Sequence, residues 1–320
     1  MRFLFVLSFA CLLAIPCTAT PPARVAAVSS ADIRQALYDY DRTLPLDAAE
    51  REAPTPPAES AAQRALRRRV RVEFTSVHDC RVPAILTLPV RFGPRFPAVL
   101  ILAGSGGHKD TDYVRIAADI MASLGYASLS IDTQYHGERS RAGRTGDIHL
   151  IDSSTNRDAW VQTVVDLRRA VDYLASRPDI DTRRLGYLGF SQGGMIGGTF
   201  VGVEPRLRCA VLAVAGGGLV EWGRRTGLLR SDQIRRSALN AAMVDPVHFV
   251  GRFAPRPLLM LSATRDEMIP RFATQALYDA AGAGRKLVWF PSGHILPPAA
   301  LLGDARRFLI EHLGIRKELH

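Results

Sequence analysis

Short apolar runs alternate with amphipathic stretches along most of this chain. The apolar runs have the length and the branched residues of buried strands, and the stretches between them carry apolar residues at helical spacing. Strands are predicted in this way at residues 98–102, 127–131, 184–189, 209–214, 257–262 and 285–290. Helices are predicted at residues 114–124, 159–176, 195–203 and 299–313. Strands that alternate with helices indicate an α/β fold, with a mostly parallel, doubly wound sheet covered on both faces.

Three segments depart from this alternation. Residues 70–76 and 81–88 predict an antiparallel hairpin at the start of a domain that spans residues 68–316. Residues 20–67 form an N-terminal arm, in which short helices are expected at residues 31–40 and 59–68 on either side of a proline-rich break. Residues 216–253 are too long for a simple crossover between strands, so we expect them to form a small helical cap insertion.

The first residues of the chain have the pattern of an export signal. Arg2 gives a basic start, residues 3–15 are mostly apolar, and Cys17-Thr18-Ala19 ends the run with small residues. We therefore expect a signal peptide over residues 1–19, cleaved near Ala19, and a mature protein that is periplasmic or extracellular. Nothing later in the chain reaches the roughly 18 uninterrupted apolar residues of a membrane span, so no integral membrane segment is expected in the mature chain.

Charge and cysteine usage narrow the class of protein further. The formal net charge is +10, but only Lys109, Lys286 and Lys317 are lysines, and the arginines are spread along the chain. Without aromatic interleaving or a known motif, this composition does not predict a nucleic-acid partner. Cys80 and Cys209 are the cysteines that remain after the signal, and their places in an α/β sheet predict two separate thiols rather than a bridge.

A nucleophile motif lies at the junction of a predicted strand and a predicted helix. Residues 189–193 read Gly-Phe-Ser-Gln-Gly, and a G-x-S-x-G sequence in this context is typical of a nucleophile elbow, with Ser191 at its tip. A neutral serine needs a base and a group that orients the base. His294 follows the last predicted strand and Asp266 follows the strand before it, so we predict them as base and acid; Glu267 is the neighbour of Asp266.

The loop at residues 103–107 is glycine-rich and follows another buried strand. We predict that the backbone N–H groups of Ser105 and Gln192 form an oxyanion hole, with Gly106 as the alternative to Ser105. The sequence further suggests a set of substrate-binding residues, which are Gly106, Tyr135, Trp222, Met243, Met268 and Ile295; several of them equally suit ordinary packing of the cap.

A metal site is a weaker hypothesis for the loop near residue 136. His108, His136 and Glu138 carry suitable ligand atoms, but their spacing does not match a zinc-binding helix. A loop held by hydrogen bonds explains them better, so the sequence predicts neither a metal nor a phosphate-binding loop.

Taken with their spacing, these motifs resemble the α/β-hydrolase superfamily, and in particular exported esterases of the dienelactone-hydrolase-like and acetyl-xylan-esterase-like groups. The resemblance covers about residues 68–316 and is carried by residues 104–107, 135–139, 170–174 and 189–194 together with Asp266 and His294. It implies an α/β-hydrolase fold and a serine esterase with no metal and no organic cofactor. Two positions depart from the pattern: dienelactone hydrolases use a cysteine where this chain has Ser191, and many esterases have histidine where it has Ala103.

The predicted function is cleavage of carboxylic esters through an acyl-enzyme on Ser191, with a small-molecule or glycan-linked ester as substrate. Short acyl groups are favoured only because the resembling families use them. A peptidase of the prolyl-oligopeptidase type is one alternative, although residues 20–67 are too few for the large gating domain of such enzymes. A non-catalytic binding protein and an acyl transferase to an acceptor other than water are the others.

Overall fold

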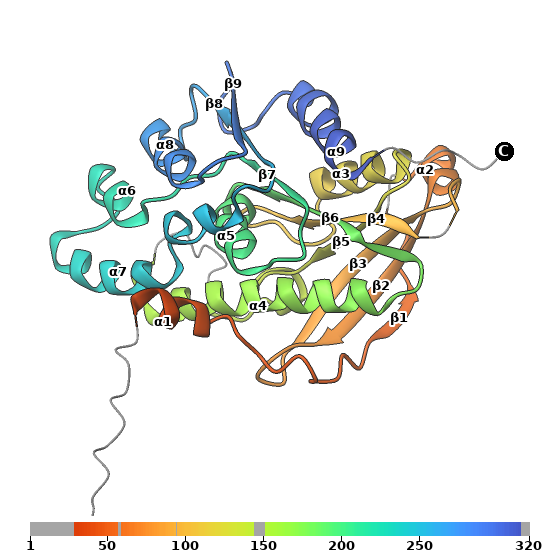
Figure 1. Cartoon of the computed structure of the whole chain (residues 1–320), viewed down its shortest axis with the longest axis horizontal. Coiled ribbons are helices and arrows are strands. Elements are labelled where there is room, and N and C mark those ends of the chain that lie inside the picture. Colours follow the sequence, from red (N-terminus) through yellow and green to blue (C-terminus); the bar gives the residue numbers. More distant parts are fainter. Residues whose placement is uncertain (1–28, 57–58, 94, 144–150, 315–320) are drawn as a thin grey trace, which may run out of the picture.

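A nine-stranded sheet forms the centre of the molecule (Figure 1). The computed structural model describes residues 29–56, 59–93, 95–143 and 151–314. The strands are β1 (Ala49–Glu52), β2 (Arg67–Thr75), β3 (Arg81–Pro89), β4 (Phe96–Leu102), β5 (Ala127–Ile131), β6 (Ile180–Phe190), β7 (Cys209–Ala213), β8 (Leu258–Ala263) and β9 (Arg285–Phe290). The predicted signal peptide over residues 1–19, with its cleavage near Ala19, lies outside the described residues.

The order of the strands confirms a mostly parallel sheet with an antiparallel N-terminal hairpin. Across the sheet the order is β1-β2-β3-β5-β4-β6-β7-β8-β9. Every neighbouring pair from β5 through β4, β6, β7 and β8 to β9 is parallel. The pairs β1 with β2, β2 with β3 and β3 with β5 are antiparallel. Because parallel strands end at one edge, the loops after β4, β6, β8 and β9 meet there.

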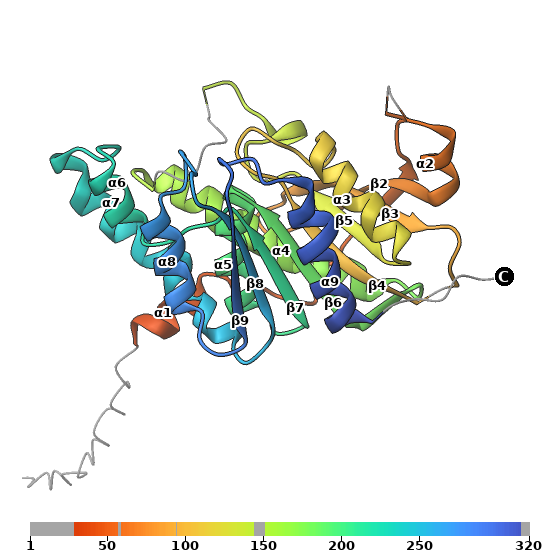
Figure 2. The same ribbon diagram turned by 90° about the horizontal axis from the view of Figure 1, so that it is seen from above.

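Helices cover both faces of this sheet. They are α1 (Ser30–Ala36), α2 (Ala61–Leu66), α3 (Asp112–Ser123), α4 (Ser154–Ser176), α5 (Gln192–Val203), α6 (Leu219–Arg225), α7 (Ser231–Val244), α8 (Arg271–Ala280) and α9 (Arg306–Leu313). One apolar cluster joins the sheet to α4, α5 and α8, and a second joins it to α3 and α9, which lie side by side in both views (Figures 1 and 2). On β4, Leu100 belongs to the first cluster and Val99 to the second, as alternation along a buried strand requires.

The N-terminal segment is more closely joined to the sheet than its composition suggests. The sequence does not predict β1, because its residues are mostly charged and all exposed, but they pair with β2 at the sheet edge. Tyr38, which follows α1, is fully buried, and its hydroxyl donates to the carbonyl oxygen of Met243 at 3.0 Å. Residues 29–66 therefore contribute both an edge strand and a core side chain to the folded unit.

Most helices differ from their predicted limits by a few residues, and two of the differences have a clear structural form. The long helix α4 begins at Ser154, because the side chain of Ser153 caps it by accepting from the N–H of Asn156 at 3.1 Å. The predicted closing helix at residues 299–313 is two elements, a π-helical turn over Ala300–Ala305 and then α9. π-Helical turns are rare and often lie at functional sites.

The predicted cap segment, residues 216–253, is helical. It contains α6 and α7, followed by 3₁₀ turns over Pro246–His248 and Val250–Phe253. Helix α7 lies against α4, and α6 lies against α7 and α8. None of the helices within the described ranges is long and apolar enough to span a membrane. Cys80 and Cys209 are separate free thiols, as the sequence predicts.

Candidate active site

Ser191 occupies a sharp turn between β6 and α5. Its φ of 51° and ψ of −117° are costly for a residue with a Cβ atom. Hydrogen bonds on both sides hold the turn: the N–H of Ser191 donates to the carbonyl of Ala213 at 2.8 Å, and its carbonyl accepts from the N–H of Met195 at 2.9 Å. The sheet and the helix together offset the strain and fix the hydroxyl at the carboxyl end of β6.

The glycines around Ser191 are explained by close backbone approach. A Cβ atom on Gly189 would lie 2.4 Å from the carbonyl oxygen of Gly193, and one on Gly193 would lie 2.4 Å from that of Leu102. Either distance is shorter than atoms tolerate without movement of the backbone. The G-x-S-x-G spacing is thus a steric requirement of this turn.

The structure brings Ser191, His294 and Asp266 together. The Nε2 atom of His294 is 2.9 Å from the Ser191 hydroxyl oxygen, and its Nδ1 atom is 2.9 Å from both carboxylate oxygens of Asp266. The three residues come from the turn after β6, the loop after β8 and the loop after β9. This relay lets a proton leave the serine for an imidazole whose other nitrogen is held by a carboxylate.

Asp266 is held in its charged form. Burial raises the pKa of this carboxyl, but hydrogen bonds from His294 and from the backbone N–H groups of Ile269 and Met268 outweigh burial and lower the pKa below its ordinary value. The two backbone donors lie 2.8 and 2.9 Å from one carboxylate oxygen. The side chain of Asp266 is therefore both oriented and ionised where it faces the imidazole.

Glu267, the neighbouring acid, has a different contact. Its carboxylate accepts from the backbone N–H of His294 at 3.2 Å, not from the ring. The two loops are also joined by backbone hydrogen bonds, from Thr264 to Phe290 at 2.8 Å and from Arg265 to Ser292 at 3.0 Å. These contacts hold the acid loop and the histidine loop in register.

The glycine-rich loop after β4 lies beside the elbow. The hydroxyl of Ser105 donates to the side-chain oxygen of Gln192 at 2.8 Å, so the side chains of the two residues predicted to supply oxyanion donors are in contact. Within the loop, the N–H of Gly104 donates to the Tyr113 hydroxyl at 2.9 Å and that of Gly107 to the carbonyl of Gly104 at 3.0 Å. The N–H groups of Gly104 and Gly107 therefore donate hydrogen bonds within the protein. Ser105 lies between these two residues, at the centre of the loop.

Tyr113 is a residue of this site that the sequence did not predict. Burial raises the pKa of its hydroxyl, and the hydrogen bond from Gly104 acts weakly in the opposite sense. The ring packs edge-on against Phe190, with centroids 5.3 Å apart. Tyr113 therefore braces the glycine-rich loop from the first turn of α3, and its place just after that loop is the only signal for it in the sequence.

Replacing Tyr113 by phenylalanine should loosen this loop. We expect Tyr113→Phe to lower kcat for a p-nitrophenyl ester about threefold to tenfold with a smaller change in KM, because losing one such hydrogen bond costs about 1 kcal/mol. Steady-state kinetics on the purified protein measure both constants. Tyr278→Phe is the matched control, since Tyr278 lies on α8 outside the site, and equal kinetics in the two variants would contradict this role.

A pocket of about 520 Å³ opens beside Ser191 and His294. Two predicted substrate-binding residues, Met268 and Ile295, line it together with Ser105. Its other walls come mainly from apolar residues of α3, the ends of β6 to β8 and the segment 296–302.

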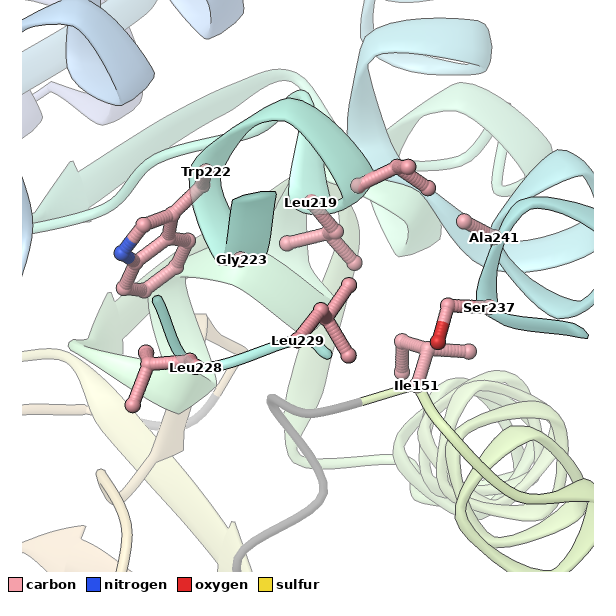
Figure 3. Close-up of a pocket in the computed structure, with 9 residues that line it drawn as sticks. Ile151, Leu219, Trp222, Gly223, Leu228, Leu229, Ser237 and Ala241 are labelled. Carbon is pink, nitrogen blue, oxygen red and sulfur yellow. The ribbon is translucent and has the colours of Figure 1, made fainter. Parts of the chain in front are cut away.

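Other predicted pocket residues lie elsewhere. Trp222 lines a separate small cavity of about 10 Å³, where Leu219, Leu229 and Ile151 gather below α6 (Figure 3). Tyr135 is half-buried in the loop after β5, and Met243 packs at the margin of the core. Gly106 is not among the described residues that line the pocket beside Ser191. No described residue of the segment 216–253 lines it either, since α7 packs against α4 and α6 packs against α7 and α8.

The possible metal ligands are held in separate contacts. The ring of His136 lies 2.7 Å from the Thr133 hydroxyl, and His108 accepts from the N–H of Asp110 at 3.1 Å. Glu138 pairs with Arg71 and Lys109, and the hydrogen bond from Arg71 is the main reason that its pKa is lowered to about 2. Within the described ranges, no group of three or more His, Cys, Asp or Glu side chains is placed to hold a metal ion.

Comparison with known proteins gives one family match. The model of the family described as acetyl xylan esterase (AXE1) matches residues 53–217. This range includes Ser105, Ser191 and Gln192 and ends before Asp266 and His294. The protein named putative hydrolase YtaP, from Bacillus subtilis, is 26% identical over 255 residues, which are 72% of this chain and 83% of that protein.

Solved structures with the same fold include two acetyl xylan esterases. The enzyme from Paenibacillus sp. R4 is 21% identical, with a TM-score of 0.66, and the alignment covers 88% of this chain and 93% of that one. Acetyl xylan esterase 1 from Thermoanaerobacterium is 17% identical, with a TM-score of 0.68, and the alignment covers 88% and 92% of the two chains. At these identities, the likeness shows that the α/β-hydrolase fold is shared.

Proposed function

Because the chain belongs to the acetyl xylan esterase family and is a carboxylic ester hydrolase, we propose that it works through an acyl-enzyme on Ser191. One observation carries this proposal. The Nε2 atom of His294 lies 2.9 Å from the Ser191 hydroxyl oxygen, and the Nδ1 atom of the same ring lies 2.9 Å from the carboxylate oxygens of Asp266. A nucleophile, a base and a group that orients the base need this sequence of contacts.

In the first half of the reaction, the hydroxyl oxygen of Ser191 attacks the ester carbonyl carbon. Its proton passes to Nε2 of His294, and the negative charge of Asp266 stabilises the imidazolium that forms. The carbonyl oxygen becomes an oxyanion, which the backbone N–H groups of Ser105 and Gln192 bind. When the tetrahedral intermediate collapses, the imidazolium gives its proton to the leaving alcohol, and the acyl group stays on Ser191.

The second half repeats these steps with water. His294 accepts a proton from the water as its oxygen attacks the acyl carbon, and the same two N–H groups bind the new oxyanion. Collapse returns the proton to Ser191 and releases a carboxylic acid. The substrate is a small-molecule or glycan-linked ester in this proposal, as the family suggests.

The test compares ester with amide substrates. We expect the mature protein to hydrolyse p-nitrophenyl butyrate at a kcat/KM at least 100-fold above that for aminoacyl-naphthylamides. Faster turnover of the amides would favour the peptidase alternative, and no turnover of either class would favour a binding protein.

We also propose that the mature protein is exported after cleavage near Ala19. The basic start, apolar run and small-residue end of residues 1–19 support this. Expression of the full chain in a bacterial host, followed by N-terminal sequencing of the periplasmic fraction, should find Thr20 as the first residue; an uncleaved cytoplasmic product would contradict it.

A further inference from the structure

The pocket beside Ser191 is large compared with an acetyl group. Its volume is about 520 Å³, which lies inside the roughly 300–1,000 Å³ range of ordinary ligand pockets. The methyl group of an acetyl ester is only slightly larger than a water, so it would leave most of this space unfilled. Pockets of this size ordinarily hold a whole organic group.

Apolar side chains from several elements line the pocket. Leu188 and Leu261 line it from β6 and β8, Ile120 from α3, and Leu296 and Leu301 from the segment 296–302. Leu301 belongs to the π-helical turn at residues 300–305, which gives that unusual turn a place in the site.

The polar side chains at the pocket are few. Ser105, Tyr113, Ser191 and His294 are its hydroxyl and imidazole groups, and each already has a contact in the catalytic arrangement. No described residue that lines the pocket is an Asp, Glu, Lys or Arg. A sugar ring would find few hydrogen-bond partners there, whereas a hydrocarbon chain needs none.

The mouth of the pocket gathers exposed apolar side chains. Nine large hydrophobic residues of the described chain are exposed, and five of them line this pocket: Tyr113, Ile116, Met268, Ile295 and Leu302. Ile295 directly follows His294 and is 88% exposed. An apolar patch that surrounds a catalytic serine indicates where an apolar ligand is removed from water.

We propose that this pocket binds the acyl group of the substrate, and that the enzyme prefers linear apolar acyl chains, such as hexanoyl, over acetyl. The inference rests on the proposed function, because an acyl chain starts at the carbon that bonds to Ser191. Gly104 and Ser105 line the pocket beside Ser191, and Ser105 supplies one of the proposed oxyanion donors. The chain then runs between α3 and the π-helical turn, over the ends of β6 to β8.

A chain-length series tests this preference. We expect kcat/KM for p-nitrophenyl esters to rise about threefold to fourfold per methylene from acetate to hexanoate, the fold-change that corresponds to about 0.8 kcal/mol per buried methylene. If acetate were the best ester and Ser191→Ala abolished its hydrolysis, the acyl-pocket inference would be overturned and the proposed function kept. Failure to hydrolyse any ester would instead remove the proposed function.

A second series separates the acyl group from the alcohol. Acetate esters of alcohols from methanol to octanol should show less than threefold variation in kcat/KM. A rise with the alcohol chain, without a rise in the acyl series, would assign the pocket to the leaving group and overturn the inference.

A pair of tryptophan variants links the preference to the pocket itself. Ile116→Trp places a larger side chain at the pocket mouth, from an α3 position that is 55% exposed. We expect it to lower the ratio of hexanoate to acetate kcat/KM at least fivefold. Leu239→Trp is the matched control, since Leu239 is 60% exposed on α7 and outside the pocket; it should keep the wild-type ratio. Equal ratios in both variants and the wild type would count against the inference.

Discussion

Replacing Ser191 by alanine is expected to lower kcat for p-nitrophenyl butyrate by a factor on the order of 10⁴ to 10⁶. The hydroxyl is the atom that forms the acyl bond, so nothing in the site replaces it. The residual rate would come from substrate binding and the oxyanion donors alone. Alanine keeps the Cβ atom at this strained position, so the melting temperature should stay within a few degrees of wild type.

The control for this variant is a serine outside the site. Ser176 ends α4, where its exposed hydroxyl donates to the carbonyl of Tyr173 at 2.8 Å. Ser176→Ala should retain full activity. A Ser191→Ala protein that is folded and still turns over ester at more than a tenth of the wild-type rate would eliminate Ser191 as the nucleophile.

The second large effect is expected for Asp266→Asn, which should lower kcat by a factor on the order of 10⁴. The amide oxygen can still accept from the N–H groups of Met268 and Ile269, so the amide nitrogen is turned toward His294. The amide group donates to Nδ1, which forces the imidazole proton onto Nε2. In that tautomer His294 cannot accept the proton of Ser191.

Glu267→Gln is the matched control for this substitution. The Glu267 carboxylate accepts from the backbone N–H of His294 at 3.2 Å and makes no hydrogen bond to the imidazole ring within the described residues, so its loss should change kcat less than tenfold. Kinetics of both variants, with thermal unfolding as a check on folding, distinguish the two neighbouring acids. If Glu267→Gln were the more damaging substitution, the assignment of the orienting acid would have to move.

The parallel core of the fold could be predicted because its strands are buried on both faces. Strands β4 and β8 are fully buried and read as nearly continuous apolar runs, and their limits lie within two residues of the predicted ones. Strand β1 could not be predicted in this way. Its Ala-Glu-Arg-Glu sequence has no apolar face, and it forms only because β2 offers an unpaired edge.

The candidate triad could be predicted for a topological reason. Ser191, Asp266 and His294 each lie within four residues after the end of a predicted strand, and parallel strands bring their carboxyl ends to one edge. The positions of Trp222 and Tyr113 follow no such rule. Trp222 is placed by how α6 packs on α7 and α8, and Tyr113 by the angle at which α3 leaves its loop. Orientation between helices depends on long-range packing, which a single sequence does not display.

The central claim is that Ser191 becomes covalently acylated, and labelling with a fluorophosphonate tests it most directly. The folded protein should take up one phosphonyl group per chain, mapped by tandem mass spectrometry to the peptide that contains Ser191, and the Ser191→Ala variant should take up none. Denatured wild-type protein serves as the control, because the serine is activated only by its folded neighbours. Absence of label on the folded protein, or a label on another residue, would contradict the account.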